Sequence, residues 1–177
     1  GWIDVQGLQL LTGEEIQAWK SSNRYLFNRI CGQASTAPGI DVDTNTLTDT
    51  VTDLVLGDLF EVIGEVDGYL DIRLPDGRKG FVSRHFCLSF EEWCSLSPDA
   101  DALLAQARQM MGFPYLWGGA SSKASDCSGF TKLVYYSQGI ILARDASQQA
   151  RYGAPVDISN IDNLMAGDLL FFGVNPE

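Results

Sequence analysis

The sequence predicts an α+β protein in which a small β-barrel precedes a domain of helices and a central strand. Between Thr48 and Leu88, short apolar runs alternate with turn residues, as is typical of small barrels. From Pro98 onward, apolar residues recur at helical spacing. The run from Asp168 to Phe172 is apolar enough to predict a strand in the middle of a sheet.

A short helix is predicted ahead of the barrel. Thr12 and Glu15 have the spacing of a capping box, in which each residue satisfies a backbone N–H group of the other. Ile16 and Trp19 give one apolar face to a helix from Gly13 to Ser21.

The remainder of residues 13–47 is interpreted as a linker. Residues 32–46 are rich in Gly, Ser, Thr, Pro and Asp and show no sustained periodicity. The opening Gly1-Trp2-Ile3 has the same pattern as Gly80-Phe81-Val82, so residues 1–12 are predicted to be the tail of a first, incomplete barrel.

The barrel itself is assigned to residues 48–97. Its expected strands are short apolar or alternating runs separated by Gly-Asp and Pro-Asp-Gly turns, namely Leu54–Leu56, Leu59–Ile63, Leu70–Leu74 and Gly80–Val82. The second domain is assigned to residues 98–177. Its first helix is predicted to begin at Ser97-Pro98-Asp99, with a capping residue, a proline and an acidic side chain.

The most informative stretch is Phe113–Phe130. Pro114 and the pair Gly118-Gly119 predict a turn in which the backbone passes close to another group. A helix is then predicted from Cys127 to a stop at Gly139.

This position gives Cys127 a possible catalytic role. Unpaired N–H groups and the positive end of the helix dipole stabilise a thiolate at a helix N-terminus. The same N–H groups, with Ser128, are placed to donate to the oxyanion formed when a thiolate attacks a carbonyl. The alternative is a buried, structural cysteine, since free cysteines are commonly buried.

The net charge indicates which classes of binding partner the protein favours. Of the 177 residues, 23 are acidic and 12 basic, giving a formal net charge of −11. Such a field disfavours nucleic acid and anionic membranes and favours cationic groups such as a free peptide amine. No run approaches the roughly 20 apolar residues of a membrane-spanning helix.

The cysteines do not predict a metal site. The four cysteines are scattered and the chain has one histidine, so neither a structural zinc site nor another cofactor is expected. Cys87 and Cys94 either pair in an oxidising compartment or are buried as reduced thiols.

Four motifs together resemble the NlpC-type cysteine peptidase family, which has a papain-like fold and cleaves peptidoglycan stem peptides. They appear in the family's order, as Tyr115-x-Trp117-Gly118-Gly119, Asp126-Cys127-Ser128-Gly129, Arg144-Asp145 with Ser147 and Gln149, and Gly167-Asp168-Leu169 with Phe171-Phe172. The barrel resembles the bacterial SH3-like domains that often precede such catalytic domains.

The resemblance implies a γ-D-glutamyl-L-diamino acid endopeptidase acting on free stem peptides, and it implies specific roles. Cys127 would be the nucleophile and Tyr115 would assist the oxyanion site. Asp126, Ser128 and Trp117 would shape the pocket for the D-glutamyl residue. Asp145 would hold the free amine of an N-terminal L-alanine, because a carboxylate binds an ammonium group strongly in a partly closed site.

Arg144 has three possible roles at this stage: keeping Asp145 ionised, binding a substrate carboxylate, or forming only a surface ion pair. Ala146 stands where such enzymes often have a serine, so one ligand hydrogen bond is expected to be missing. The barrel is expected to wall the pocket, through Glu61 or Tyr69, and so to exclude peptides still attached to glycan.

A papain-like mechanism also needs a general base, which the resemblance places on a histidine downstream of the Gly-Asp-Leu motif. The lone His85 precedes Cys127 and lies in the barrel segment, so it is interpreted as a surface or barrel residue. Either the chain is an internal piece of a longer protein, which we favour, or it is an inactive relative. A chain that truly ended at Glu177 is expected to lack peptidase activity.

Two other functions stay open from the sequence: an inactive peptidoglycan-binding module and an acyltransferase on the same fold. For the peptidase, the expected setting is the cell envelope of a bacterium, with the cytoplasm as the alternative, and the expected oligomeric state is a monomer.

Overall fold

The computed structural model describes residues 8–39 and 49–173. The chain divides into two compact units, Gly1–Glu92 and Trp93–Glu177, so the second unit begins slightly before the predicted boundary at Pro98. The incomplete barrel predicted from Gly1-Trp2-Ile3 lies outside the described residues.

The first unit opens with the predicted helix, α1 (Gly13–Ser21). The Thr12 hydroxyl accepts a hydrogen bond from the Glu15 N–H group at 3.2 Å, and the Thr12 N–H group donates to Glu15 Oε2 at 2.7 Å. Both halves of the capping box are therefore formed, and the predicted helix is confirmed at both ends.

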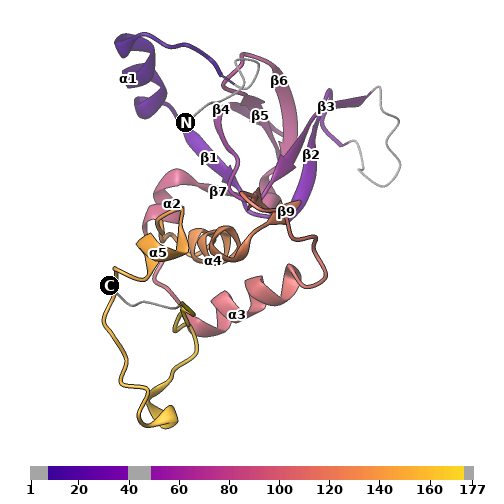
Figure 1. Cartoon of the computed structure of the whole chain (residues 1–177). Helices are drawn as coiled ribbons and strands as arrows, with labels where there is room; N and C mark the ends of the chain where they lie inside the picture. The colour runs from indigo at the N-terminus through magenta and orange to yellow at the C-terminus, as the bar shows by residue number, and fades with distance from the viewer. Residues whose placement is uncertain (1–7, 40–48, 174–177) are drawn as a thin grey trace. The chain divides into compact units, whose positions relative to one another are not determined.

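A seven-stranded antiparallel sheet forms the rest of this unit, with the strand order β3-β2-β6-β5-β4-β1-β7 (Figure 1). The strands are β1 (Arg24–Phe27), β2 (Cys31–Ser35), β3 (Thr50–Val55), β4 (Leu59–Val66), β5 (Tyr69–Arg73), β6 (Lys79–Ser83) and β7 (Cys87–Ser89). A single 3-10 turn, η4 (Arg84–Phe86), joins the last two strands. Strands β3 to β6 confirm the four predicted in the barrel segment.

The interpretation of residues 13–47 as helix and linker alone is wrong for two segments. Strand β1 pairs with β4 and with β7, and β2 pairs with β3 and with β6. The β2 sequence, Cys-Gly-Gln-Ala-Ser, has no apolar alternation. It is extended because its neighbours supply the hydrogen bonds, a tertiary effect that overrides weak local preference.

The expected closed barrel is not seen. Closure requires the two edge strands of a sheet to pair, but in the part of the chain that the structure describes β3 pairs with β2 and the short β7 pairs with β1. The SH3-like identity of this segment stays a prediction. The unit's apolar core is formed by buried residues from the strands and the turns between them, including Phe27, Phe60, Leu70, Ile72 and Cys87.

The second unit consists of short helices with little sheet. After α2 (Phe90–Cys94), which overlaps the boundary, come α3 (Ala100–Gln109), the hairpin of β8 (Ala120–Ser121) and β9 (Ala124–Ser125), α4 (Cys127–Tyr136), α5 (Ala146–Gln149) and the 3-10 turn η5 (Ile161–Asn163). Helix α4 packs against α3 and against β8. Among the described residues, no helix has the length and apolarity needed to span a membrane.

Helix α3 begins later than predicted. Asp99, not Ser97, is the N-cap, because the Asp99 carboxylate accepts hydrogen bonds from the N–H groups of Asp101 and Ala102. A carboxylate is a strong acceptor at a helix N-terminus, so Ser97 and Pro98 stay outside the helix.

The strand predicted at Asp168–Phe172 is wrong in this structure: these residues have no regular secondary structure. A strand exists only when a neighbour accepts its hydrogen bonds, and none of the described strands pairs with this segment. Its side chains are consequently exposed, Leu170 by 61% and Phe172 by 92%.

Candidate active site

Cys127 is the first residue of α4, and Asp126 is the N-cap. The Asp126 carbonyl accepts the first helical hydrogen bond, from the Phe130 N–H group at 2.8 Å. Asp126 Oδ1 accepts from the Gly129 N–H group at 2.7 Å. The predicted helix start is confirmed, as is the stop at Gly139, whose φ of +80° only glycine adopts without strain.

Two backbone donors remain unused at this helix end. The Asp126 N–H group donates to the Gly119 carbonyl at 3.1 Å, and the Gly129 N–H group is bound by the Asp126 carboxylate. No described residue accepts from the N–H groups of Cys127 and Ser128. These two donors, beside a thiol, form a site able to bind an oxyanion.

The Cys127 side chain is exposed, whereas Cys87 is buried. The alternative of a buried, structural cysteine at position 127 is therefore wrong. Of the other two cysteines, Cys31 and Cys94 are both exposed and unpaired. The expected burial thus applies to Cys87 but not to Cys94.

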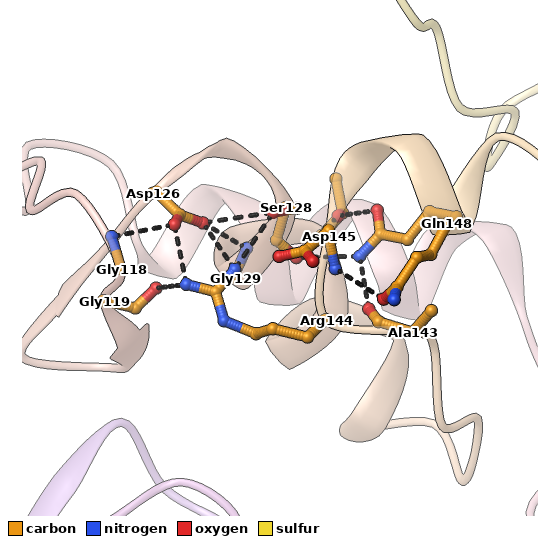
Figure 2. A network of polar contacts seen from close by, with 11 residues as sticks. Gly118, Gly119, Asp126, Ser128, Gly129, Ala143, Arg144, Asp145 and Gln148 are labelled. Carbon is orange, nitrogen blue, oxygen red and sulfur yellow. Dashed lines mark hydrogen bonds and ion pairs between the residues drawn. The ribbon is translucent and has the colours of Figure 1, made fainter. Parts of the chain in front are cut away.

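An ion pair between Arg144 and the N-cap Asp126 supports the start of α4 (Figure 2). Arg144 Nη2 lies 2.7 Å from Asp126 Oδ2, and Arg144 Nη1 lies 3.1 Å from Asp126 Oδ1. The pair is partly shielded, with the side chains 33% and 10% exposed. Hydrogen bonds from Arg144, followed by that from the Gly129 N–H group, hold the pKa of Asp126 far below its usual range.

The same ion pair binds the loop that precedes the cysteine. Asp126 Oδ2 accepts from the Gly118 N–H group at 3.0 Å, and Arg144 Nη2 donates to the Gly119 carbonyl at 3.3 Å. A side chain at Gly129 would place its Cβ 2.2 Å from the Gly119 oxygen. Glycine at position 129 therefore permits the close backbone approach that the sequence predicted for this loop.

Ser128 is buried under this network. Its hydroxyl lies 3.2 Å from Asp126 Oδ1, to which it donates, and accepts from Arg144 Nη1 at 3.1 Å. Because its proton is bound by Asp126, the backbone N–H group of Ser128, and not its hydroxyl, is available to an oxyanion.

Tyr115 and Trp117 are placed differently from the residues of the ion pair. Their side chains are exposed by 63% and 86%. The Tyr115 backbone forms an isolated bridge with Ser125, the last residue of β9, which holds this loop next to the start of α4. The two aromatic side chains thus face outward on the segment that leads to Cys127.

The partner of Arg144 is Asp126 and not Asp145. Asp145 is exposed and is the N-cap of α5, and its N–H group donates to Gln148 Oε1 at 3.3 Å. The Arg144 pKa is raised mainly by the hydrogen bond to Asp126. The negative charges of Asp126, Asp145 and Cys127 raise it further, so Asp145 still acts on Arg144 through its charge. The guanidinium is thus bound by Asp126, in an ion pair whose carboxylate side chain is only 10% exposed.

Gln149 has a position that the sequence did not predict. It is 4% exposed, and its amide joins the first turn of α4 to the segment that precedes Arg144. Its presence in a motif was the only available signal. Glutamine is mostly exposed in proteins, so burial could not be inferred from residue type.

His85 lies in the first unit, in η4, and is exposed. Its ring contacts Phe86 at a centroid distance of 5.9 Å. Its interpretation as a surface residue is confirmed.

Residues 112–177 match the model of the NlpC/P60 family. A relative from Bacillus cereus, named gamma-D-glutamyl-L-lysine dipeptidyl-peptidase, is 36% identical over 102 residues, which are 57% of this chain and 30% of the relative. A protein of the same name from Bacillus subtilis is 41% identical over 73 residues, 41% of this chain and 24% of the relative. The chain thus spans less than a third of the length of these curated relatives.

The fold is also similar to a crystal structure of an NlpC/P60 family protein from Bacillus cereus. The TM-score is 0.71 at 24% identity, and the match covers 88% of this chain and 48% of that protein. The predicted resemblance to NlpC-type peptidases is confirmed for residues 112–177.

Proposed function

We propose that this protein is a cysteine peptidase that hydrolyses the γ-D-glutamyl to diamino-acid bond of freed peptidoglycan stem peptides. The observation that carries the proposal is the exposed Cys127 beside two unused N–H donors at the start of α4. The names of the two Bacillus relatives support the bond that is cut.

In the first step, the Cys127 thiolate attacks the γ-carbonyl carbon of the D-glutamyl residue. A C–S bond forms, and the carbonyl oxygen becomes an oxyanion that accepts hydrogen bonds from the N–H groups of Cys127 and Ser128. The C–N bond then breaks, the diamino acid leaves as a protonated amine, and water hydrolyses the thioester. We assign the proton transfers to a histidine downstream of the Gly167–Phe172 motif, where the family resemblance implies one.

Substrate selection is assigned to the groups around Cys127. The Asp145 carboxylate, exposed and next to the Arg144–Asp126 ion pair, would bind the ammonium group of an N-terminal L-alanine. Arg144 acts by holding Asp126 and the loop at Gly118 and Gly119. Tyr115 would assist the oxyanion site, and Trp117 would face the D-glutamyl residue together with the Asp126–Ser128 turn.

The setting follows from this substrate. Freed stem peptides arise from cell-wall turnover in bacteria, so we place the protein in murein recycling at the cell envelope.

The test measures, by mass spectrometry, the release of L-alanyl-γ-D-glutamate from L-Ala-γ-D-Glu-L-Lys. A separate assay uses the tripeptide in which diaminopimelate replaces lysine. The natural-length protein is compared with its Cys127→Ala variant, and the Cys94→Ala variant serves as a matched control because Cys94 is also exposed. We expect release by the parent and the control, and none by Cys127→Ala.

Release by Cys127→Ala would contradict the nucleophile. No release by any form, with the tripeptide still bound, would assign the protein to the peptidoglycan-binding modules. Transfer of the dipeptide to an added amine in preference to water would assign it to the acyltransferases.

A further inference from the structure

Gln149 forms three side-chain hydrogen bonds in a buried position. Its Nε2 atom donates to the Ser128 carbonyl at 3.0 Å and to the Ala143 carbonyl at 2.9 Å. Its Oε1 atom accepts from the Thr131 hydroxyl at 2.8 Å. The amide orientation follows from these partners, because only the NH₂ group can face two carbonyl oxygens.

These bonds join two parts of the proposed site. Ser128 follows the nucleophile Cys127 in the first turn of α4, and Ala143 precedes Arg144 and Asp145. The Gln149 backbone N–H group also donates to the Asp145 carbonyl at 2.9 Å. Gln149 therefore binds the Ala143–Asp145 segment at both ends and attaches it to the turn that carries the thiol.

The Arg144–Asp126 ion pair is a second connection between the same two segments, but it differs in kind. It acts on the N-cap side chain and the glycine loop, and the Arg144 side chain is 33% exposed. The Gln149 connection acts on two backbone carbonyls and is shielded from water. Because neutral, buried hydrogen bonds are short-ranged and directional, the Gln149 connection constrains position and does not alter charge.

We propose that Gln149 is a positioning residue that sets the separation between the Cys127 thiol and the Asp145 carboxylate. This inference rests on the proposed function, in which Asp145 binds the amine of the first substrate residue and Cys127 attacks the γ-carbonyl of the second. A fixed separation between these two groups selects substrates with one dipeptide between the free amine and the scissile bond. Gln149 thereby contributes to specificity without touching the substrate.

The test uses Gln149→Met, which keeps the volume and removes the hydrogen bonds, in the natural-length protein. The measured quantities are kcat/KM for L-Ala-γ-D-Glu-L-Lys, kcat/KM for its N-acetyl derivative, and the rate of Cys127 alkylation by iodoacetamide. Gln138→Met is the matched control, because Gln138 lies just beyond α4 and, among the described residues, its amide donates only to the adjacent Ser137 carbonyl.

We expect Gln149→Met to lower kcat/KM for the free-amine substrate by about 100-fold, the order of loss for a 1 Å misplacement of a binding group. The acetylated substrate, which has no ammonium for Asp145, should change much less, so the preference for a free amine falls. The alkylation rate should be unchanged, and Gln138→Met should behave as the parent does.

Equal losses on both substrates, or a changed alkylation rate, would show that Gln149 supports the fold only, and would overturn the inference while leaving the proposed function intact. No turnover by the parent would overturn the proposed function and the inference with it. If Gln149→Met does not fold, Thr131→Val removes one hydrogen bond of the same amide, together with the contact of the Thr131 hydroxyl with the Ser128 carbonyl at 3.0 Å, and is expected to lower the free-amine preference to a smaller extent. An unchanged preference in Thr131→Val would then overturn the inference.

Discussion

The two units of this chain bury different kinds of side chain. In the described part of the first unit, the buried side chains are apolar or cysteine, with Ser35 as the exception. In the described part of the second unit, the buried apolar residues Trp93, Leu103, Met110, Leu133 and Val134 are matched in number by the buried polar residues Ser122, Asp126, Ser128, Ser137 and Gln149.

This difference shows how each unit obtains its order. Apolar burial is non-directional, so it stabilises a sheet without placing any one atom accurately. Hydrogen bonds and ion pairs are directional, so they fix individual atoms, and a buried polar group left without a partner costs free energy. The second unit uses the directional interactions around Cys127, where the proposed chemistry needs accurate positions.

The largest expected effect is in the apolar core of the first unit. The change is Phe60→Ala, at a position that is 0% exposed. The free energy of unfolding of the first unit should fall by about 3–5 kcal/mol, because the substitution leaves a large cavity. Hydrogen exchange measured peptide by peptide should show the loss in β4 and β5. Val66→Ala, at a 41% exposed position of the same strand, should have little effect, and equal losses in the two variants would contradict an apolar core at Phe60.

A smaller effect, confined to the site, is expected for Gly129→Ala. The new Cβ would lie 2.2 Å from the Gly119 carbonyl oxygen, so α4 or the glycine loop must shift, at a cost of about 1–3 kcal/mol. Hydrogen exchange at the start of α4 should accelerate, and iodoacetamide should alkylate Cys127 at a changed rate. Gly173→Ala is the control, because its Cβ would meet no atom within 4 Å; an unaltered Cys127 rate in Gly129→Ala would argue against the close approach.

The last expected effects are those of pH, and they should have opposite directions in the two units. The Asp126 pKa is lowered mainly by Arg144, so its contribution to stability is complete above the unfolded pKa of about 3.9 and is lost as pH falls toward the folded value. Unfolding of the second unit followed from pH 7 to 2.5 should therefore show a weaker acid dependence in Asp126→Asn than in the parent.

In the first unit the titrating group is Cys87. Burial raises the pKa of this thiol to about 12. Its contribution is therefore complete below the unfolded pKa of about 8.5 and is lost as pH rises toward the folded value. Above pH about 9, the free energy of unfolding of the first unit should fall more steeply with pH in the parent protein than in Cys87→Ala. Parallel curves of unfolding free energy against pH in the two proteins would contradict this burial effect.

Local interactions account for the predictions that succeeded. Helix α1 could be assigned because Thr12 and Glu15 are three residues apart and satisfy each other. Helix α4 could be assigned because apolar residues recur at helical spacing after Cys127 and Gly139 follows them; the Asp126 cap was found only in the structure. In both cases the residues that decide the structure are neighbours along the chain.

Long-range interactions account for the failures. Strand β2 has no strand-like pattern and is extended because β3 and β6 pair with it. The apolar run at Leu169–Phe172 has a strand-like pattern but no described strand pairs with it. In both segments, hydrogen-bonding neighbours and not residue type decide whether a strand forms.

At the site, the sequence by itself determined which residue types are present and that Cys127 lies at a helix start, because capping and periodicity are read within a few residues. Only the tertiary structure decided that Arg144 pairs with Asp126 and not with Asp145, and that Gln149 is buried between Ser128 and Ala143. Arg144 and Asp126 are 18 residues apart in the chain, and Gln149 and Ser128 are 21 residues apart. Contacts over such separations depend on how the helices pack, and no local propensity encodes that packing.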